Sequence, residues 1–183
     1  MTVALPKGLT ADEFLAWAAG QPGRYELVNG EIVTMAAERV GHARAKLAAV
    51  TALTAAIEAR RLPCEAMIDG VAVRIDDATV YEPDALVRCG ERVGDDAIFV
   101  TDPVIVVEVV SPSSQALDSG AKLEDYFRLP SLRHYLIVKT DTRAVIHHRA
   151  GGDGRLETAI LREGRIELDP PGIGIELAAL FAG

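Results

Sequence analysis

The sequence predicts a mixed α/β (α+β) domain in which helices flank a central mixed β-sheet with additional β-hairpins. The first observation is the stretch 104–110, Val-Ile-Val-Val-Glu-Val-Val, which is rich in β-branched residues on both faces, as strands in the middle of a sheet are. The second is the segment 41–61, where apolar residues recur at steps of three and four, as in an amphipathic helix. The third is Asn29-Gly30, a typical tight-turn pair, between two alternating segments.

Length and composition indicate one domain over residues 1–183. Of these 183 residues 49% are hydrophobic and 25% are charged, which suits a soluble globular chain with one core. No apolar run reaches transmembrane length, and no basic segment precedes an apolar one as in a signal peptide. We therefore expect a cytoplasmic protein without a membrane partner. Cys64 and Cys89 lack the spacing of a metal motif and are expected as reduced thiols.

The net charge of −8 lowers the expectation of tight, metal-free binding to nucleic acid, because proteins that coat nucleic acid are usually basic. A local basic strip is still compatible with it, and residues 41–61 carry four basic side chains against one acidic side chain. That segment either faces nucleic acid or presents an ordinary solvated helix face. His42, near its start, is expected as a capping or surface residue.

The first part of the chain is expected to form a short helix, a hairpin and the long helix. Thr10 and Glu13 have the spacing of a capping box at a helix start. Residues 24–28 and 31–35 should pair about Asn29-Gly30. Within them, Glu26 is either a surface partner of Arg24 or a member of a site. The long helix should place the residues at positions 47, 50, 53 (or 54) and 57 inward.

Pro83 marks an irregular point in the next expected strand, residues 80–89, because proline cannot donate to a sheet ladder. Asp84 directly after it is therefore held in a defined place. A loop over 91–102 leads to the strand 104–110. A helix over 115–129 should follow, then strands at 134–138, 144–149, 156–162 and 166–168, and a helical turn close to residue 180.

Glu108 interrupts the apolar strand. A buried carboxylate is costly unless a metal ion, a cationic side chain or a shifted pKa compensates it. The sequence 111–114, Ser-Pro-Ser-Ser, ends the strand and offers caps for the next helix. Glu108 is therefore the first candidate site residue, and the alternative is an edge strand on which Glu108 faces water.

Asp84, Glu108 and Lys122 form a candidate constellation. Two carboxylates on neighbouring strands offer the hard oxygen ligands that suit Mg²⁺ or Mn²⁺. A nearby ammonium can position a water or stabilise negative charge on a phosphate. The alternative for Lys122 is a surface lysine paired with Glu124 or Asp125.

In this order the residues resemble the PD-(D/E)XK nuclease superfamily, with its restriction-endonuclease-like fold, and more narrowly the Uma-type family of bacterial endonucleases. The resemblance covers most of the chain and rests on the segments 24–32, 83–84, 107–113 and 130–135, and on Lys122 with Tyr126. The lysine expected two residues after the strand glutamate is absent, and Val110 stands there. Lys122 matches the position on the next helix to which the Uma-type family displaces it.

The resemblance implies Asp84, Glu108 and the main-chain carbonyl of Val109 as metal ligands, with Lys122 and Glu26 completing the catalytic site. It implies Mg²⁺ (or Mn²⁺) as cofactor and an endonuclease that hydrolyses phosphodiester bonds of nucleic acid, expected to be DNA, with a metal-activated water. A homodimer is expected, because two copies of one site can cut both strands of a duplex. The alternative is a non-catalytic binding or assembly module of the same fold, favoured by the acidic charge and by Val110.

Overall fold

The computed structural model describes residues 5–110, 120–152 and 154–181. The turn expected at 111–114 and the first part of the helix expected at 115–129 lie outside these residues. The helical elements are α1 (Ala11–Ala18), α2 (Val40–Arg60), α4 (Ala121–Tyr126) and the 3-10 turn η1 (Leu177–Phe181). In this part of the chain no helix is both long and apolar enough to cross a membrane.

The larger sheet is mixed, as predicted. Its strand order is β11-β10-β9-β8-β6-β3, in which β8 and β9 run parallel and the other neighbours run antiparallel. The strands are β3 (Cys64–Ile68), β6 (Ala85–Cys89), β8 (Ile105–Val110), β9 (His134–Lys139), β10 (Ala144–Ala150) and β11 (Leu156–Leu161). All six residues of β8 are buried, so the interpretation of Glu108 as a solvent-facing edge residue is wrong.

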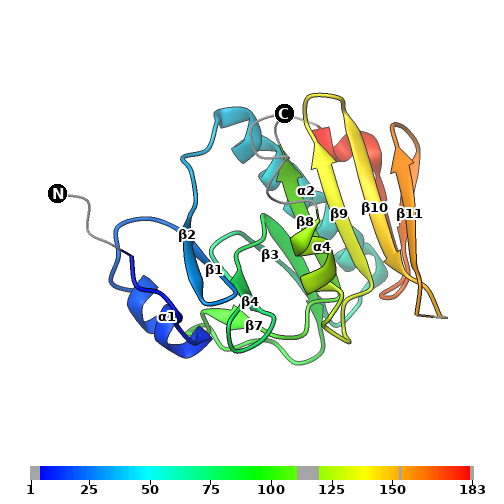
Figure 1. The fold of residues 1–183 in the computed structure, drawn as a ribbon. Coiled ribbons are helices and arrows are strands. Elements are labelled where there is room, and N and C mark those ends of the chain that lie inside the picture. The colour runs from blue at the N-terminus through cyan, green and yellow to red at the C-terminus, as the bar shows by residue number, and fades with distance from the viewer. Residues whose placement is uncertain (1–4, 111–119, 153, 182–183) are drawn as a thin grey trace.

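Opposite faces of β8 pack against different helices, which explains its continuous Val/Ile composition. Ile105, Val107 and Val109 share a core with α2 and η1, whereas Val106 and Val110 share a second core with Tyr126 of α4. Figure 1 shows α2 behind the larger sheet and α4 in front of it. A strand whose two faces are both covered has no side that faces solvent, so apolar and polar residues need not alternate along it.

A smaller sheet, ordered β2-β1-β5-β4-β7, adjoins the larger one. Its strands are β1 (Tyr25–Val28), β2 (Glu31–Thr34), β4 (Ala72–Arg74), β5 (Val80–Tyr81) and β7 (Phe99–Val100). The predicted hairpin turn is confirmed, since Asn29 and Gly30 both have positive φ, at 51° and 79°. Helix α1 begins with the predicted Thr10–Glu13 capping box and covers this sheet through Phe14.

The expected strand 80–89 is divided between the two sheets. β5 belongs to the smaller sheet and β6 to the larger one, and Glu82, Pro83 and Asp84 lie between them. This break is the irregularity predicted from Pro83, and it leaves Asp84 immediately before the first residue of β6. The remaining strands, β12 (Arg165–Leu168) and β13 (Ile173–Glu176), form a hairpin that joins the α2 core.

Helix α2 packs on the sheet through a set of residues that matches the expected one only in part: Leu53 and Ile57 are buried as predicted, and Val50 packs against the core. Ala45, Ala49, Leu53 and Ile57, at steps of four, form its buried stripe, while Leu47 is 60% exposed. The assignment of Leu47 to the core was therefore wrong. Because two of the four buried positions are alanines, the first half of the helix brings a small side-chain surface to the sheet, and the neighbouring Lys46 is buried there as well.

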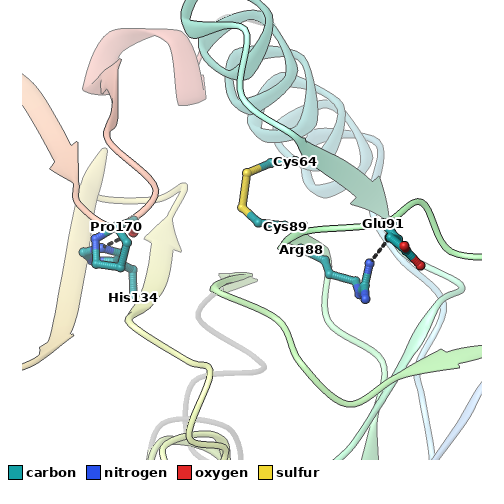
Figure 2. Close-up of a disulfide and its surroundings, with 6 residues drawn as sticks. All are labelled: Cys64, Arg88, Cys89, Glu91, His134 and Pro170. Atoms are coloured by element: carbon teal, nitrogen blue, oxygen red, sulfur yellow. Dashed lines mark hydrogen bonds between the residues drawn. A yellow bond between two sulfur atoms is a disulfide. The ribbon is translucent and has the colours of Figure 1, made fainter.

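A disulfide joins Cys64 of β3 to Cys89 of β6, so the expectation of reduced thiols was wrong (Figure 2). The two cysteines are opposite each other in the antiparallel pairing of these strands, which brings their side chains together. Spacing in the sequence cannot show this pairing.

Figure 2 also shows His134, whose Nε2 donates to the carbonyl of Pro170 at 3.0 Å. Burial lowers the pKa of His134 to about 4.

Reduction of the Cys64–Cys89 disulfide is expected to lower the free energy of unfolding by roughly 3 kcal/mol, because the bridge closes a chain loop with a sequence separation of 25. Urea unfolding followed by circular dichroism, with and without reductant, measures the difference. A Cys64→Ala/Cys89→Ala variant is the control, and its midpoint should not respond to reductant. Equal midpoints for thiol-titrated oxidised and reduced protein would contradict the expectation.

Candidate active site

Three of the four predicted site side chains meet at the carboxyl end of β8. Lys122 of α4 donates to Glu26 Oε1 at 2.9 Å and to Glu108 Oε1 at 3.1 Å. Each of the three side chains is at most 8% exposed. Lys122 is thus a buried residue and not the surface lysine of the alternative interpretation. Likewise, Glu26 turns inward, while Arg24 pairs with other carboxylates.

Two tyrosines line this cluster. The Tyr126 hydroxyl donates to Glu108 Oε1 at 3.0 Å, and the Lys122 ammonium lies 5.1 Å from the centre of the Tyr81 ring. Burial, followed by the nearby carboxylates, raises the pKa of Tyr126 well above its usual range. The hydroxyl therefore stays protonated and serves as a fixed donor to Glu108. Tyr81 in turn donates to Asp125 of α4 at 2.6 Å.

Asp84, the fourth predicted residue, is buried at the start of β6 with its own partners. Its Oδ2 accepts the Val109 N–H at 2.6 Å, and its Oδ1 lies 3.3 Å from His42 Nε2 and 3.5 Å from Lys46 Nζ. Burial would raise the pKa of Asp84, but His42, the Val109 amide and Lys46 outweigh that effect and hold the pKa below its usual value. Asp84 is thus a stable carboxylate at neutral pH.

The strand register relates Asp84 to Glu108. Ala85 of β6 is opposite Val107 of β8, so the next position places Asp84 across from Glu108. The contacts of the two carboxylates differ, however: Asp84 contacts side chains of α2, whereas Glu108 contacts side chains of α4. The sheet therefore brings these two residues to the same strand end and gives each a separate set of partners.

Val109 follows Glu108 in β8 and contacts Asp84 across the strand pair. Its N–H points toward Asp84, while the carbonyl of the next residue, Val110, accepts from Thr140 on the opposite side, after β9. The N–H and C=O of one strand residue point to the same neighbour, so the Val109 carbonyl faces the Asp84 side. Since β6 begins only at Ala85, this carbonyl lies beyond the paired part of the β6–β8 ladder.

A group of charged residues beside Asp84 was not predicted from the sequence. Lys46 is 3% exposed and donates to Glu38 and Asp69, each at 2.5 Å. Burial alone would lower its pKa, but the hydrogen bonds to Asp69 and Glu38 raise the pKa above the usual value. His42, expected at the surface, has a half-buried side chain directed at Asp84. The available signal was helical spacing, since residues 42, 45, 46 and 49 occupy one face of α2.

Arg24 extends this group toward the smaller sheet. It forms ion pairs with Glu38 at 2.7 Å, and with Asp69 and Glu82 at 2.9 Å. The backbone N–H of Glu82 donates to Glu26 Oε1 at 3.0 Å, which links the Arg24 group to the Lys122 cluster. The two sheets therefore meet at one continuous polar network.

One set of ligand atoms in this network is grouped closely enough to be compatible with a metal ion. Within the described residues, the group of three or more His, Cys, Asp or Glu side chains whose ligand atoms all lie within 4.8 Å of one another is Glu38, His42 and Asp84. Carboxylate oxygens suit Mg²⁺ and Mn²⁺, and imidazole suits transition metals. The donor chemistry beside Asp84 is thus compatible with a divalent cation.

The profile of the Uma2 family, described as "Putative restriction endonuclease", matches residues 11–180. The chain belongs to the Uma2 family. Two uncharacterized proteins of Synechocystis are similar to this Uma2 member. One is 27% identical over 177 residues, covering 96% of this chain and 92% of the relative. The other is 29% identical over 156 residues, covering 84% and 87%.

A solved structure shares the fold of this Uma2 member. It is a crystal structure described as a "putative nuclease belonging to DUF820" from Anabaena variabilis, which superposes with a TM-score of 0.71 at 18% identity and covers 95% of this chain and 98% of that one. The family match agrees with the resemblance inferred from the sequence, and the structural match confirms the predicted fold.

Tyr126→Phe is expected to lower the free energy of unfolding by roughly 2 kcal/mol, because it removes a hydrogen bond to the buried Glu108 carboxylate and keeps the ring. Urea unfolding measures the change. Tyr25→Phe is the matched control, since its hydroxyl makes only an exposed 3.4 Å contact with the Pro22 carbonyl, and it should change stability by less than about 0.5 kcal/mol. Equal effects of the two variants would show that the Tyr126 hydroxyl does not stabilise Glu108.

Proposed function

We propose that residues 1–183 form one nuclease domain, an endonuclease that uses Mg²⁺ (or Mn²⁺) to hydrolyse phosphodiester bonds of DNA. The observation that carries the proposal is the buried Lys122 ammonium, held between Glu26 and Glu108 at the strand end where Asp84 also lies. A lysine in a buried position near two strand carboxylates is costly to maintain for stability alone. Membership of a family described as "Putative restriction endonuclease" supports the same reaction class.

Asp84, Glu108 and the main-chain carbonyl of Val109 are the groups proposed to hold the metal. All three lie where β8 ends and β6 begins, and all three offer oxygen, the ligand atom that Mg²⁺ prefers. When bound, the metal supplies a Lewis acid for a phosphoryl oxygen and lowers the pKa of a coordinated water.

The other residues orient these groups and carry charge. Lys122 is proposed to stabilise negative charge on the phosphate and to position the attacking water through its ammonium protons. Glu26 holds Lys122 in place, and Tyr126 fixes the Glu108 carboxylate by donating to it. On the other side, the Val109 amide fixes Asp84 Oδ2. These contacts keep the site in one geometry before substrate arrives.

DNA is the proposed substrate because the family description names a restriction endonuclease. A cytoplasmic location is proposed with it, since an enzyme of this kind must meet DNA inside the cell. The overall charge of −8 opposes long-range attraction to a polyanion. Binding therefore depends on the metal and on local cations such as those of α2, among which Arg44 is exposed.

Lys122→Arg is the sharpest test of the catalytic role. It keeps a positive charge between Glu26 and Glu108, so folding should largely survive, but the planar guanidinium places its charge differently from an ammonium. We expect cleavage of plasmid DNA with Mg²⁺ or Mn²⁺ to fall by about a hundredfold, the scale seen when an electrostatic stabiliser is lost. Lys122→Ala should lose as much activity and also roughly 3 kcal/mol of stability, because it removes the ammonium that contacts two buried carboxylates.

Lys7→Ala is the control, since Lys7 makes only an exposed pair with Glu31, and it should cleave like the wild type. Full activity in Lys122→Arg would remove Lys122 from the catalytic site. No cleavage of DNA or RNA by the wild type with any divalent ion would favour the alternative of a non-catalytic binding or assembly module.

A homodimer is proposed because one site per chain cuts one strand, and a C₂ pair of chains matches the symmetry of a duplex. Light scattering of the purified chain at micromolar concentration should give twice the chain mass of 19.5 kDa. A monomeric mass, both with and without DNA, would contradict this proposal.

A further inference from the structure

The polar network between the two sheets carries more negative than positive charge. Its carboxylates are Glu26, Glu38, Asp69, Glu82, Asp84 and Glu108, and its lysine and arginine partners are Arg24, Lys46 and Lys122. Among the described residues, six carboxylates against three cations leave three negative charges if His42 is neutral. Partly buried carboxylates in excess are stabilised by a bound cation.

One set of close ligand atoms in this network includes Asp84 but not Glu108. It belongs to Glu38, His42 and Asp84, whose ligand atoms lie within 4.8 Å of each other. His42 Nε2 is 3.3 Å from Asp84 Oδ1 and 3.2 Å from Asp84 Oδ2, so one imidazole nitrogen faces both oxygens of the carboxylate. A cation that binds Asp84 on this side therefore meets a nitrogen donor as well.

Lys46 currently occupies the space between two of these groups. Its ammonium lies 2.5 Å from Glu38 Oε1 and 3.5 Å from Asp84 Oδ1, and it also donates to Asp69 Oδ2 at 2.5 Å. Asp69 is outside the three-residue ligand group. Lys46 can therefore keep its contact with Asp69 when Glu38 and Asp84 bind a metal. Metal binding then does not leave the buried Lys46 ammonium without a carboxylate partner.

We propose that His42 and Glu38 are further ligands of the Asp84 metal site, so that the protein binds Mn²⁺ more tightly than Mg²⁺. This inference rests on the proposed metal dependence and deepens it. Mg²⁺ prefers oxygen ligands in an octahedral arrangement and loses its water reluctantly, whereas imidazole favours transition-metal ions. The mixed set of two carboxylates and one imidazole thus discriminates between the two ions through His42.

Calorimetric titration of the metal-free full-length chain with MnCl₂ and with MgCl₂ tests the preference. The wild type should bind Mn²⁺ at least about tenfold more tightly than Mg²⁺. His42→Ala should weaken Mn²⁺ binding by about tenfold or more and leave Mg²⁺ binding within about threefold, the difference expected from loss of one nitrogen ligand. Glu38→Gln should weaken both ions, and Asp84→Asn should abolish the binding of both.

Pulsed EPR of the Mn²⁺ complex identifies the ligand directly, independently of cleavage. The wild type should show magnetic coupling of Mn²⁺ to an imidazole nitrogen, and His42→Ala should lose it. Because His42→Ala removes a partner of Asp84, His42→Gln serves as a second variant that keeps a hydrogen-bond donor and an oxygen. Glu58→Gln, on the exposed face of the same helix, is the control and should match the wild type.

The outcomes separate the two proposals. Binding of Mn²⁺ that depends on Asp84, without nitrogen coupling and without sensitivity to His42→Gln, overturns the role of His42 and leaves the proposed nuclease function standing. Absence of binding of either ion to the wild type overturns both. Nitrogen coupling that persists in Asp84→Asn places the metal elsewhere and also overturns the inference.

Discussion

Burial of a carboxylate in a strand covered on both faces is the constraint on which the rest of this structure depends. Glu108 sits in β8, where the neighbouring side chains are Val or Ile and every residue is buried. An uncompensated charge there would destabilise the fold by several kcal/mol. Lys122 and Tyr126, both on α4, supply the compensating contacts. The buried charge in β8 therefore requires the contacts that α4 supplies.

Compensation of the buried charge also links the smaller sheet to the larger one. Lys122 carries one charge and contacts two carboxylates, and the second, Glu26, comes from β1 of the smaller sheet. Arg24, two residues before Glu26, then binds Glu38, Asp69 and Glu82, which lie on three different connections. Hydrophobic packing builds a separate core on each side of β8, and the core on the α4 side also contains Val73, Tyr81 and Val100 of the smaller sheet. The charged contacts add a polar link between the two sheets.

The site has two sides that meet at Val109. One side contains Glu108, Glu26 and Lys122 under α4, and the other contains Asp84, His42 and Lys46 beside α2. Each side contains a buried ammonium that pairs with carboxylates. Such an arrangement suits a site in which a metal ion and an ammonium group bind the same carboxylates. Replacing the ammonium by the metal ion changes the local charge little.

Local patterns in the sequence determined the elements: the buried strand from its β-branched run, the hairpin from Asn29-Gly30, the capping box of α1 and the irregularity at Pro83. The ordered set of Asp84, Glu108 and Lys122 also identified the family. Only the tertiary structure decided that Cys64 faces Cys89, that Leu47 points outward while Lys46 points inward, and that His42 faces Asp84. Those facts depend on strand register and on the rotation of α2 about its axis. Both are set by contacts between residues far apart in sequence, which local periodicity does not encode.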